Sequence, residues 1–115
     1  MKFSALVAIL ADELEEMAIK IAKDAGAEGV TILSARGIGA IEKKIFFGLT
    51  HEGSQSVLVF VLERKLSVAV LKRLAKDLEL SKHSNGVVFT LPLEHIAGID
   101  PMQIQRFEQR IKDEL

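Results

Sequence analysis

Four stretches of the chain are almost entirely apolar, and their lengths are typical of β-strands. They are Phe3–Leu10, Gly29–Ala35, Val57–Leu62 and Val87–Leu91. Runs of about four to eight apolar residues, bounded by glycine, proline or polar residues, predict buried strands. Phe3–Leu10 and Val57–Leu62 lack a regular alternation of apolar and polar positions, so both faces of these strands are expected to be covered.

Between the first two strands, apolar residues recur with the period of an α-helix. Asp12 and Glu15 have the spacing of a capping box, and Gly26 is suited to the C-terminal cap. The apolar stripe between them consists of Leu14, Met17, Ala18, Ile21, Ala22 and Ala25. We therefore predict a first helix that begins at Asp12 and ends at Gly26.

Two further helices are predicted after the third and fourth strands. The second covers about Lys65–Leu78, and its inward residues are Val70, Leu71, Leu74 and Leu78. Asp100 as N-cap and Pro101 as first helical residue predict a last helix over residues 101–115. Its apolar stripe consists of Ile104, Phe107, Ile111 and Leu115. The polar stretch Ser81–Gly86 predicts a turn or loop before the fourth strand.

The predicted elements follow one another in the order β-α-β-β-α-β, with one added C-terminal helix. This order is typical of the α+β ferredoxin-like fold, a four-stranded antiparallel sheet with both helices on one face. We predict that residues 1–115 form a single domain of this kind. Because the two helices cover one face only, the other needs a partner subunit or the folded-back C-terminal helix. We predict a homo-oligomer and keep the folded-back helix as the alternative.

Composition and charge narrow the classes of function. The 115 residues have a formal net charge of −1 and no cysteine. Nucleic-acid binding needs a basic face, so it is not predicted, and disulfides and Cys-based metal sites are excluded. No apolar run reaches the roughly 20 residues of a membrane span. The short apolar N-terminal run leads into an acidic helix start, not a cleavage site, so we predict a cytoplasmic protein without membrane insertion.

Residues that could carry catalysis or bind a metal are sparse. His51, His83 and His95 lie in three separate segments, without the spacing of a ligand pair. The acidic residues at the start of the first helix are placed favourably for the helix dipole, not as an acid–base pair. No nucleophile lies at a recognisable spacing from a base. We therefore predict neither an enzyme nor a metal site.

Residues 36–56, between the second and third strands, form a long irregular connection of the kind that often carries function. Its first part, Arg36–Gly39, contains two glycines that either form a plain turn or let backbone amides approach an anion. Ile45–Phe47 predicts an extension of the second strand, which makes His51–Ser54 the tip of a hairpin.

Three stretches, Ala25–Thr31, Arg36–Gly39 and Ser84–Glu94, occur in a consistent order with the predicted helices. Together they resemble the nitrogen-regulatory P-II signal-transduction proteins, over a core of roughly residues 3–99. The resemblance implies a homotrimer whose sheets face a central axis. It also implies that residues 36–56 correspond to the T-loop, which contacts target proteins, and Leu80–Val87 to the B-loop.

The resemblance further implies a ligand site in the clefts between subunits, where family members bind ATP or ADP, with 2-oxoglutarate beside the nucleotide. Thr31 lies where family members have a residue near the adenine ring. The implied binding residues are Thr31, Arg36, Gly37, Ile38, Gly39, Ser84, Asn85 and Gly86. Taken without the resemblance, Asn85 and Gly86 are a turn signal and Arg36 suits a solvent-facing strand end.

The chain departs from the family's pattern at the residues that hold phosphates. Ala40 replaces the basic residue after the T-loop glycines, and Val87 replaces the B-loop lysine. The two arginines expected after the fourth strand fall at about Gly98 and Asp100. A triphosphate needs guanidinium or ammonium donors, so the usual clamp is absent. The cofactor is left unknown, with an adenine nucleotide as a candidate, and the family's modified T-loop tyrosine is missing because the chain has no Tyr.

Three functions follow from these observations. The first is a P-II-like trimeric regulatory protein that senses a small molecule between subunits and signals to a target protein through residues 36–56. The second is an oligomeric protein-interaction module without a ligand. The third is a metal-binding relative of the divalent-cation-tolerance proteins, which share the fold; scattered histidines and the lack of cysteine disfavour it.

Overall fold

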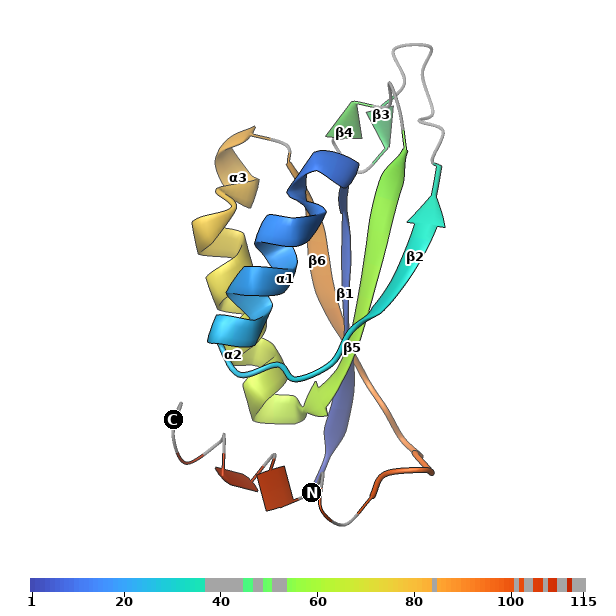
Figure 1. Ribbon diagram of the computed structural model, residues 1–115, viewed down its shortest axis with the longest axis vertical. Coiled ribbons are helices and arrows are strands. Elements are labelled where there is room, and N and C mark those ends of the chain that lie inside the picture. The colour runs from blue at the N-terminus through green and yellow to red at the C-terminus, as the bar shows by residue number, and fades with distance from the viewer. Residues whose placement is uncertain are drawn as a thin grey trace.

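A computed structural model of the chain shows a twisted sheet with helices packed on one side (Figure 1). The part of the chain that it describes consists of residues 1–36, 45–46, 49–50, 54–83, 85–100, 102, 105–106, 108–109 and 112. Within these residues, every helix is too short or too polar to cross a membrane.

The main sheet has four antiparallel strands in the order β2-β5-β1-β6. They are β1 (Phe3–Ala11), β2 (Thr31–Ala35), β5 (Gln55–Glu63) and β6 (Gly86–Pro92). In the centre of the sheet, Val7 lies opposite Val59 on one side and Phe89 on the other. The first and third main strands along the chain are therefore central. This confirms the predicted α+β, ferredoxin-like arrangement.

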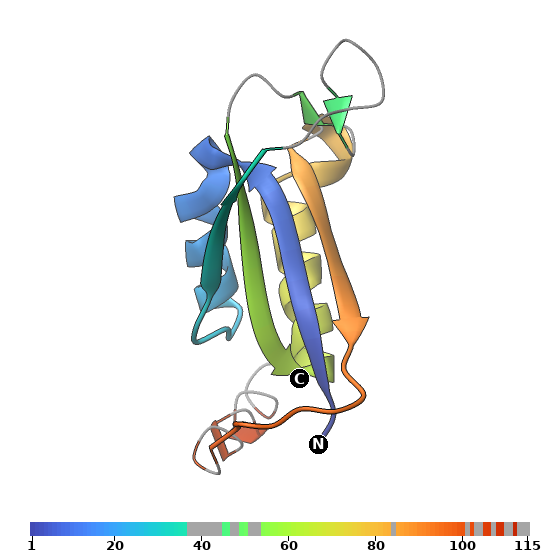
Figure 2. The same cartoon turned by 90° about the vertical axis from the view of Figure 1, so that its right-hand side faces the viewer.

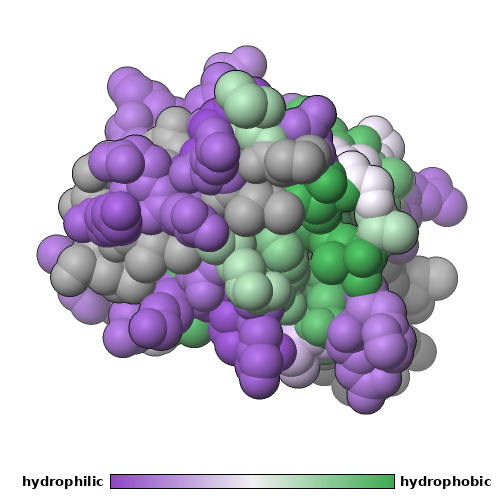
Figure 3. Space-filling view, turned by 90° about the horizontal axis from the view of Figure 1, so that it is seen from below, coloured by the Kyte–Doolittle hydropathy of each residue, from purple (hydrophilic) through white to green (hydrophobic). Residues whose placement is uncertain are grey.

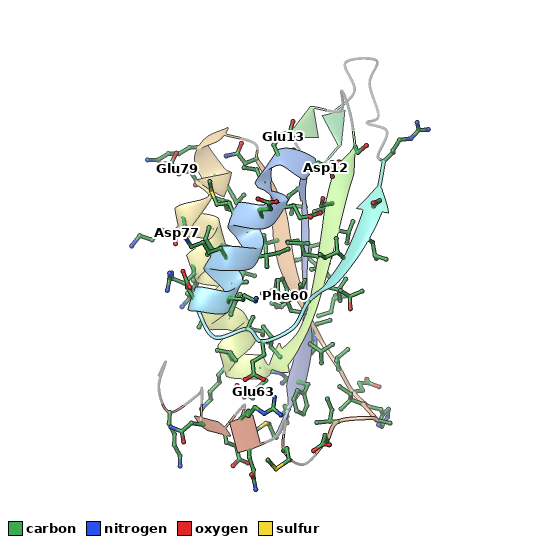
Figure 4. The ribbon with its side chains drawn as sticks, in the orientation of Figure 1. Asp12, Glu13, Phe60, Glu63, Asp77 and Glu79 are labelled. Carbon is green, nitrogen blue, oxygen red and sulfur yellow. The ribbon has the colours of Figure 1, made fainter. Side chains whose placement is uncertain are left out.

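The helices cover one face of this sheet (Figure 1). They are the 3₁₀ turn η1 (Asp12–Leu14), α1 (Glu15–Asp24), α2 (Arg64–Asp77) and the short α3 (Leu80–His83). Phe60 is 2% exposed and points from β5 toward the helices (Figure 4). The fully buried residues around it include Leu6, Leu10, Ala18, Ala22, Leu58, Leu66, Val70 and Leu74. Most residues of the apolar stripes predicted for the first two helices therefore contribute to the core, but the prediction is wrong for Met17, which is 53% exposed.

Two local predictions about the helices are wrong. Asp12 does not cap the first helix: no side chain caps η1, and the Ser56 hydroxyl lies 2.7 Å from both Asp12 Oδ1 and Glu15 Oε1. A long-range contact to β5 thus replaces the local capping box. The stretch Ser81–Gly86 is not a loop throughout, because residues up to His83 belong to α3.

The start of α2 is fixed by a cap that the sequence analysis did not identify. Glu63 Oε2 accepts hydrogen bonds from the backbone N–H groups of Lys65, at 2.7 Å, and Leu66, at 3.0 Å. These donors have no acceptor within the helix, and the buried carboxylate of Glu63 supplies one. The positive end of the helix dipole in turn stabilises the negative charge of this carboxylate. Figure 4 shows Glu63 at this junction between β5 and α2.

The predicted extension of the second strand is also wrong. Ile45–Phe46 forms β3 and pairs with Leu49–Thr50, β4, in a separate two-stranded sheet. The proposed hairpin tip at His51–Ser54 lies outside the described residues except for Ser54. β3 therefore pairs with β4, its neighbour in the sequence, and does not lengthen β2.

The second face of the main sheet is bare in the described part of the chain (Figure 2). Val7, Ile9 and Val57 are half-buried there, whereas Leu33 and Leu91 are each 51% exposed. Figure 3, which looks from below, shows hydrophobic side chains gathered on the side where the sheet lies in Figure 1. The described residues between 102 and 112 are helical and lie beyond the end of the sheet where β1 begins, not across this face (Figure 1).

Candidate functional site

A cleft of about 300 Å³ opens where the connection between α1 and β2 meets β5. Its lining consists of Glu28, Gly29, Val30, Thr31, Val59, Val61 and Leu62. One wall therefore comes from the end of the α1–β2 connection and the first residue of β2. The other wall comes from the second half of β5.

The cleft follows from the unequal lengths of two neighbouring strands. β2 has five residues and β5 has nine, and their pairing ends where Thr31 lies opposite Val59. Before Thr31 the chain turns away toward α1, so Val61 and Leu62 have no strand partner on that side within the described residues. A strand edge left open in this way offers backbone N–H and C=O groups to a ligand.

Gly26 and Ala27 form the turn that leads from α1 into the α1–β2 connection. Gly26 has φ 121, a conformation that glycine adopts without strain, and it directly follows Ala25, the C-cap of α1. Ala27 is buried, and its N–H donates to the Ala22 carbonyl at 2.9 Å. Glu28 and Gly29 then run along the cleft before β2 begins. The turn after the helix therefore sets the position of one wall.

The walls are mostly apolar, with a few polar groups. Val59, Val61 and Leu62 from β5 line the cleft together with Thr31, whose hydroxyl is one of the polar groups. A Cβ added to Gly29 would meet nothing within 4 Å, so a ligand has room to approach the backbone there. Apolar walls with a small number of polar groups are typical of sites for small organic molecules. A flat, weakly polar ring fits this chemistry better than a highly charged group.

Charge at the cleft is confined to its rim. Glu28 is the charged residue among the described lining residues, and its Oε2 lies 3.5 Å from Arg106 Nη1. Lys23 lines a much smaller void of about 10 Å³ on the helix side of the same connection. No described lining residue is a cation.

The structure separates the residues that were predicted to form the site. Thr31 lines the cleft, whereas Arg36 is exposed at the opposite end of β2. Gly37, Ile38, Gly39 and Ser84 lie outside the described residues.

Asn85 and Gly86 have structural contacts far from this cleft within one chain. Asn85 Nδ2 donates to the Leu78 carbonyl at 2.9 Å and so closes the end of α2. Gly86 has φ 151, and a Cβ there would lie 2.5 Å from Leu10 Cδ2 and 2.6 Å from the Ile9 carbonyl oxygen. Gly86 pairs with Leu10 and Val61 with Ala5, so the two regions lie about 16 Å apart along β1.

Most of the cleft was missed by the sequence analysis. The second strand was predicted from Gly29, and pairing from that point would have left no open edge beside Val61. The signal that could have found the cleft is the Ala25–Val30 stretch, in which two glycines and Glu28 interrupt the apolar pattern. Among the described residues, no group of three His, Asp or Glu side chains could hold a metal ion.

Comparisons with known proteins identify a family and similar folds. The family model described as Nitrogen regulatory protein P-II matches residues 3–102. A structure of CPII bound to ADP, AMP and acetate, from Thiomonas intermedia K12, is 22% identical with a TM-score of 0.64, covering 89% of this chain and 93% of the other. The same protein bound to ADP and bicarbonate is 23% identical, with a TM-score of 0.61 and coverages of 81% and 87%.

A PII-like signaling protein from Thermus thermophilus is 18% identical, with a TM-score of 0.62, and the match covers 81% of this chain and 87% of the other. At these identities the solved structures show the fold alone. No curated protein matches the chain significantly.

Proposed function

The chain belongs to the nitrogen regulatory protein P-II family, and on this premise we propose that it is a regulatory protein that binds an adenine nucleotide in the cleft beside Thr31. The observation that carries the proposal is the open edge of β5, which creates an apolar cleft at the residue that the family resemblance places near the adenine ring. An adenine ring is flat and apolar on its faces and carries hydrogen-bonding groups on its edges. The strand edge and the Thr31 hydroxyl can meet those groups.

The charge of the cleft favours a nucleotide with one or two phosphates over a triphosphate. A carboxylate at the rim and the lack of a cation in the described lining do not suit the charge of ATP. The similar structures from Thiomonas intermedia K12 contain ADP, or ADP with AMP. ADP and AMP are therefore the ligands that we propose for this chain.

The bare face of the sheet supports assembly into a homotrimer, the state that the family resemblance implies. Partly exposed valine, leucine and phenylalanine side chains on β1, β5 and β6 gain free energy when a second copy removes them from water. A closed cyclic arrangement leaves no such face open. The cleft, at the edge strand β2, then lies near the boundary between copies.

In this proposal, residues 36–56 transmit the binding of the nucleotide to a target protein. They connect β2, which begins in the cleft, to β5, which forms its opposite wall. A nucleotide that fixes these two strands relative to each other shifts the ends from which the segment emerges. We propose that this shift changes how the segment contacts a target protein, in the cytoplasm and without chemistry on the nucleotide.

Calorimetry with a substitution that fills the cleft tests the proposal. Gly29→Leu places a side chain in open space, so AMP and ADP binding should be lost while the melting temperature stays close to that of the wild type. Gly29→Ala is the matched control, since one methyl group leaves most of the 300 Å³ free. AMP binding that survives Gly29→Leu places the ligand elsewhere. If no nucleotide binds to the wild-type oligomer, the ligand-free interaction module takes its place.

A further inference from the structure

The rim of the cleft contains an ion pair between two distant parts of the chain. Arg106 Nη1 and Glu28 Oε2 are 3.5 Å apart, and the two residues are separated by 78 positions in the sequence. Their side chains are 57% and 30% exposed. Arg106 is one of the described helical residues between 102 and 112, so this contact brings a cation from the C-terminal part of the chain to a residue of the cleft lining.

Because this ion pair is exposed to solvent, Arg106 can readily exchange Glu28 for another anionic partner. Exposed pairs of this length hold their partners weakly, because water and salt screen the attraction and both side chains lose freedom. The guanidinium group has five N–H donors in a planar fork, and a phosphate oxygen pair matches that fork better than a single carboxylate oxygen at 3.5 Å does. An anion at the rim can therefore displace Glu28.

An anionic ligand group at the cleft needs a positively charged side chain to bind it. Glu28 repels a phosphate, and the described lining supplies no cation. Arg106 cancels this repulsion when it pairs with Glu28, and it attracts the phosphate when the pair opens. Both effects act on the same ligand group at the same rim.

We infer that Arg106 recognises the anionic group of the ligand and that Glu28 holds Arg106 at the rim until that anion replaces it. This inference rests on the nucleotide function proposed above. It assigns to Arg106 the role of supplying the cation that the described lining of the cleft lacks. Arg106 then exchanges its contact with Glu28 for one with the ligand whenever an anionic ligand enters, and returns to Glu28 when the ligand leaves.

The test compares AMP with adenosine, which differ by the phosphate alone, by calorimetry on the full-length oligomer. The wild type should bind AMP more tightly, and Arg106→Gln should weaken AMP binding about tenfold or more while adenosine binding stays unchanged. Arg106→Lys should restore part of the AMP preference. Arg73→Gln is the matched control: Arg73 forms a similarly exposed ion pair with Asp77, also at 3.5 Å, within α2.

A second variant tests the role of the carboxylate. Glu28→Gln frees Arg106 and removes the repulsion, so AMP affinity should rise about two- to fivefold, with adenosine again unchanged. Asp77→Asn, the control on α2, should change neither affinity.

Several results would overturn the inference. Equal loss of AMP and adenosine binding in Arg106→Gln would mean that Arg106 only supports the fold of the cleft. Loss of the AMP preference in Lys23→Gln, and not in Arg106→Gln, would assign the phosphate to Lys23 at the neighbouring void. Adenosine binding without any AMP preference would overturn the role of Arg106 but leave the cleft as the nucleotide site. Binding of neither ligand would overturn both proposals.

Discussion

At the scale of single residues, Gly86 and Gly29 differ in the space available for a side chain. Gly86→Ala should destabilise the protein by about 2 kcal/mol or more, because its Cβ would lie 2.5 Å from Leu10 Cδ2 and 2.6 Å from a backbone oxygen, at a φ of 151. Urea unfolding followed by circular dichroism measures this change. Gly29→Ala is the control and should change stability by no more than about 0.5 kcal/mol, since its Cβ meets nothing within 4 Å. Equal effects at both positions would contradict the steric explanation.

These two glycines also show what residue patterns can and cannot predict. Asn85-Gly86 was predicted as a turn signal, but Gly86 begins β6, and the reason for this glycine is its close approach to β1, a contact across 76 positions that no local pattern contains. Thr31 lines the cleft, and its predicted contact with a ligand, which comes from the family resemblance, stays a prediction. Glu28 and Arg106 were not predicted, because their proximity depends on where the C-terminal segment lies.

At the scale of elements, the start of α2 depends on one buried carboxylate. Glu63→Ala should cost about 1–2 kcal/mol, because it leaves the N–H groups of Lys65 and Leu66 without their acceptor. Glu63→Gln keeps an acceptor oxygen at the same place and should recover part of that loss. Midpoints of urea unfolding measure both changes. If the glutamine variant is as unstable as the alanine variant, the charge and not the hydrogen bonds sets the stability of this junction.

Strands and helices were predicted well wherever a periodic apolar pattern exists, and poorly where distant contacts decide. The four main strands and the first two helices follow from runs and stripes that also form the core. The capping box failed because Ser56, on a strand 41 positions beyond Glu15, takes the place of the local partner. The start of β2 was misplaced by two residues, and that small error concealed the cleft, because the open edge of β5 exists only when β2 begins at Thr31.

At the scale of the whole molecule, the bare sheet face determines whether copies assemble. Light scattering after size exclusion should give a mass three times that of the 12.6 kDa chain, and the melting temperature should rise with protein concentration, because association stabilises the folded state. Val7 lies at the centre of this face, opposite Val59 and Phe89. Val7→Glu should therefore give single chains, since three carboxylates would meet where apolar side chains otherwise pack.

The control for this experiment lies on the other side of the molecule. Val68 on α2 is 41% exposed, and Val68→Glu adds the same charge without touching the sheet face. This variant should keep the mass and the concentration dependence of the wild type. A wild-type chain that runs as a monomer, with an unchanged mass in Val7→Glu, would mean that the sheet face tolerates water. The cleft would then have to bind its ligand within one chain, and the Arg106 and Gly29 variants would still report on it, because both residues act within the same subunit as Thr31.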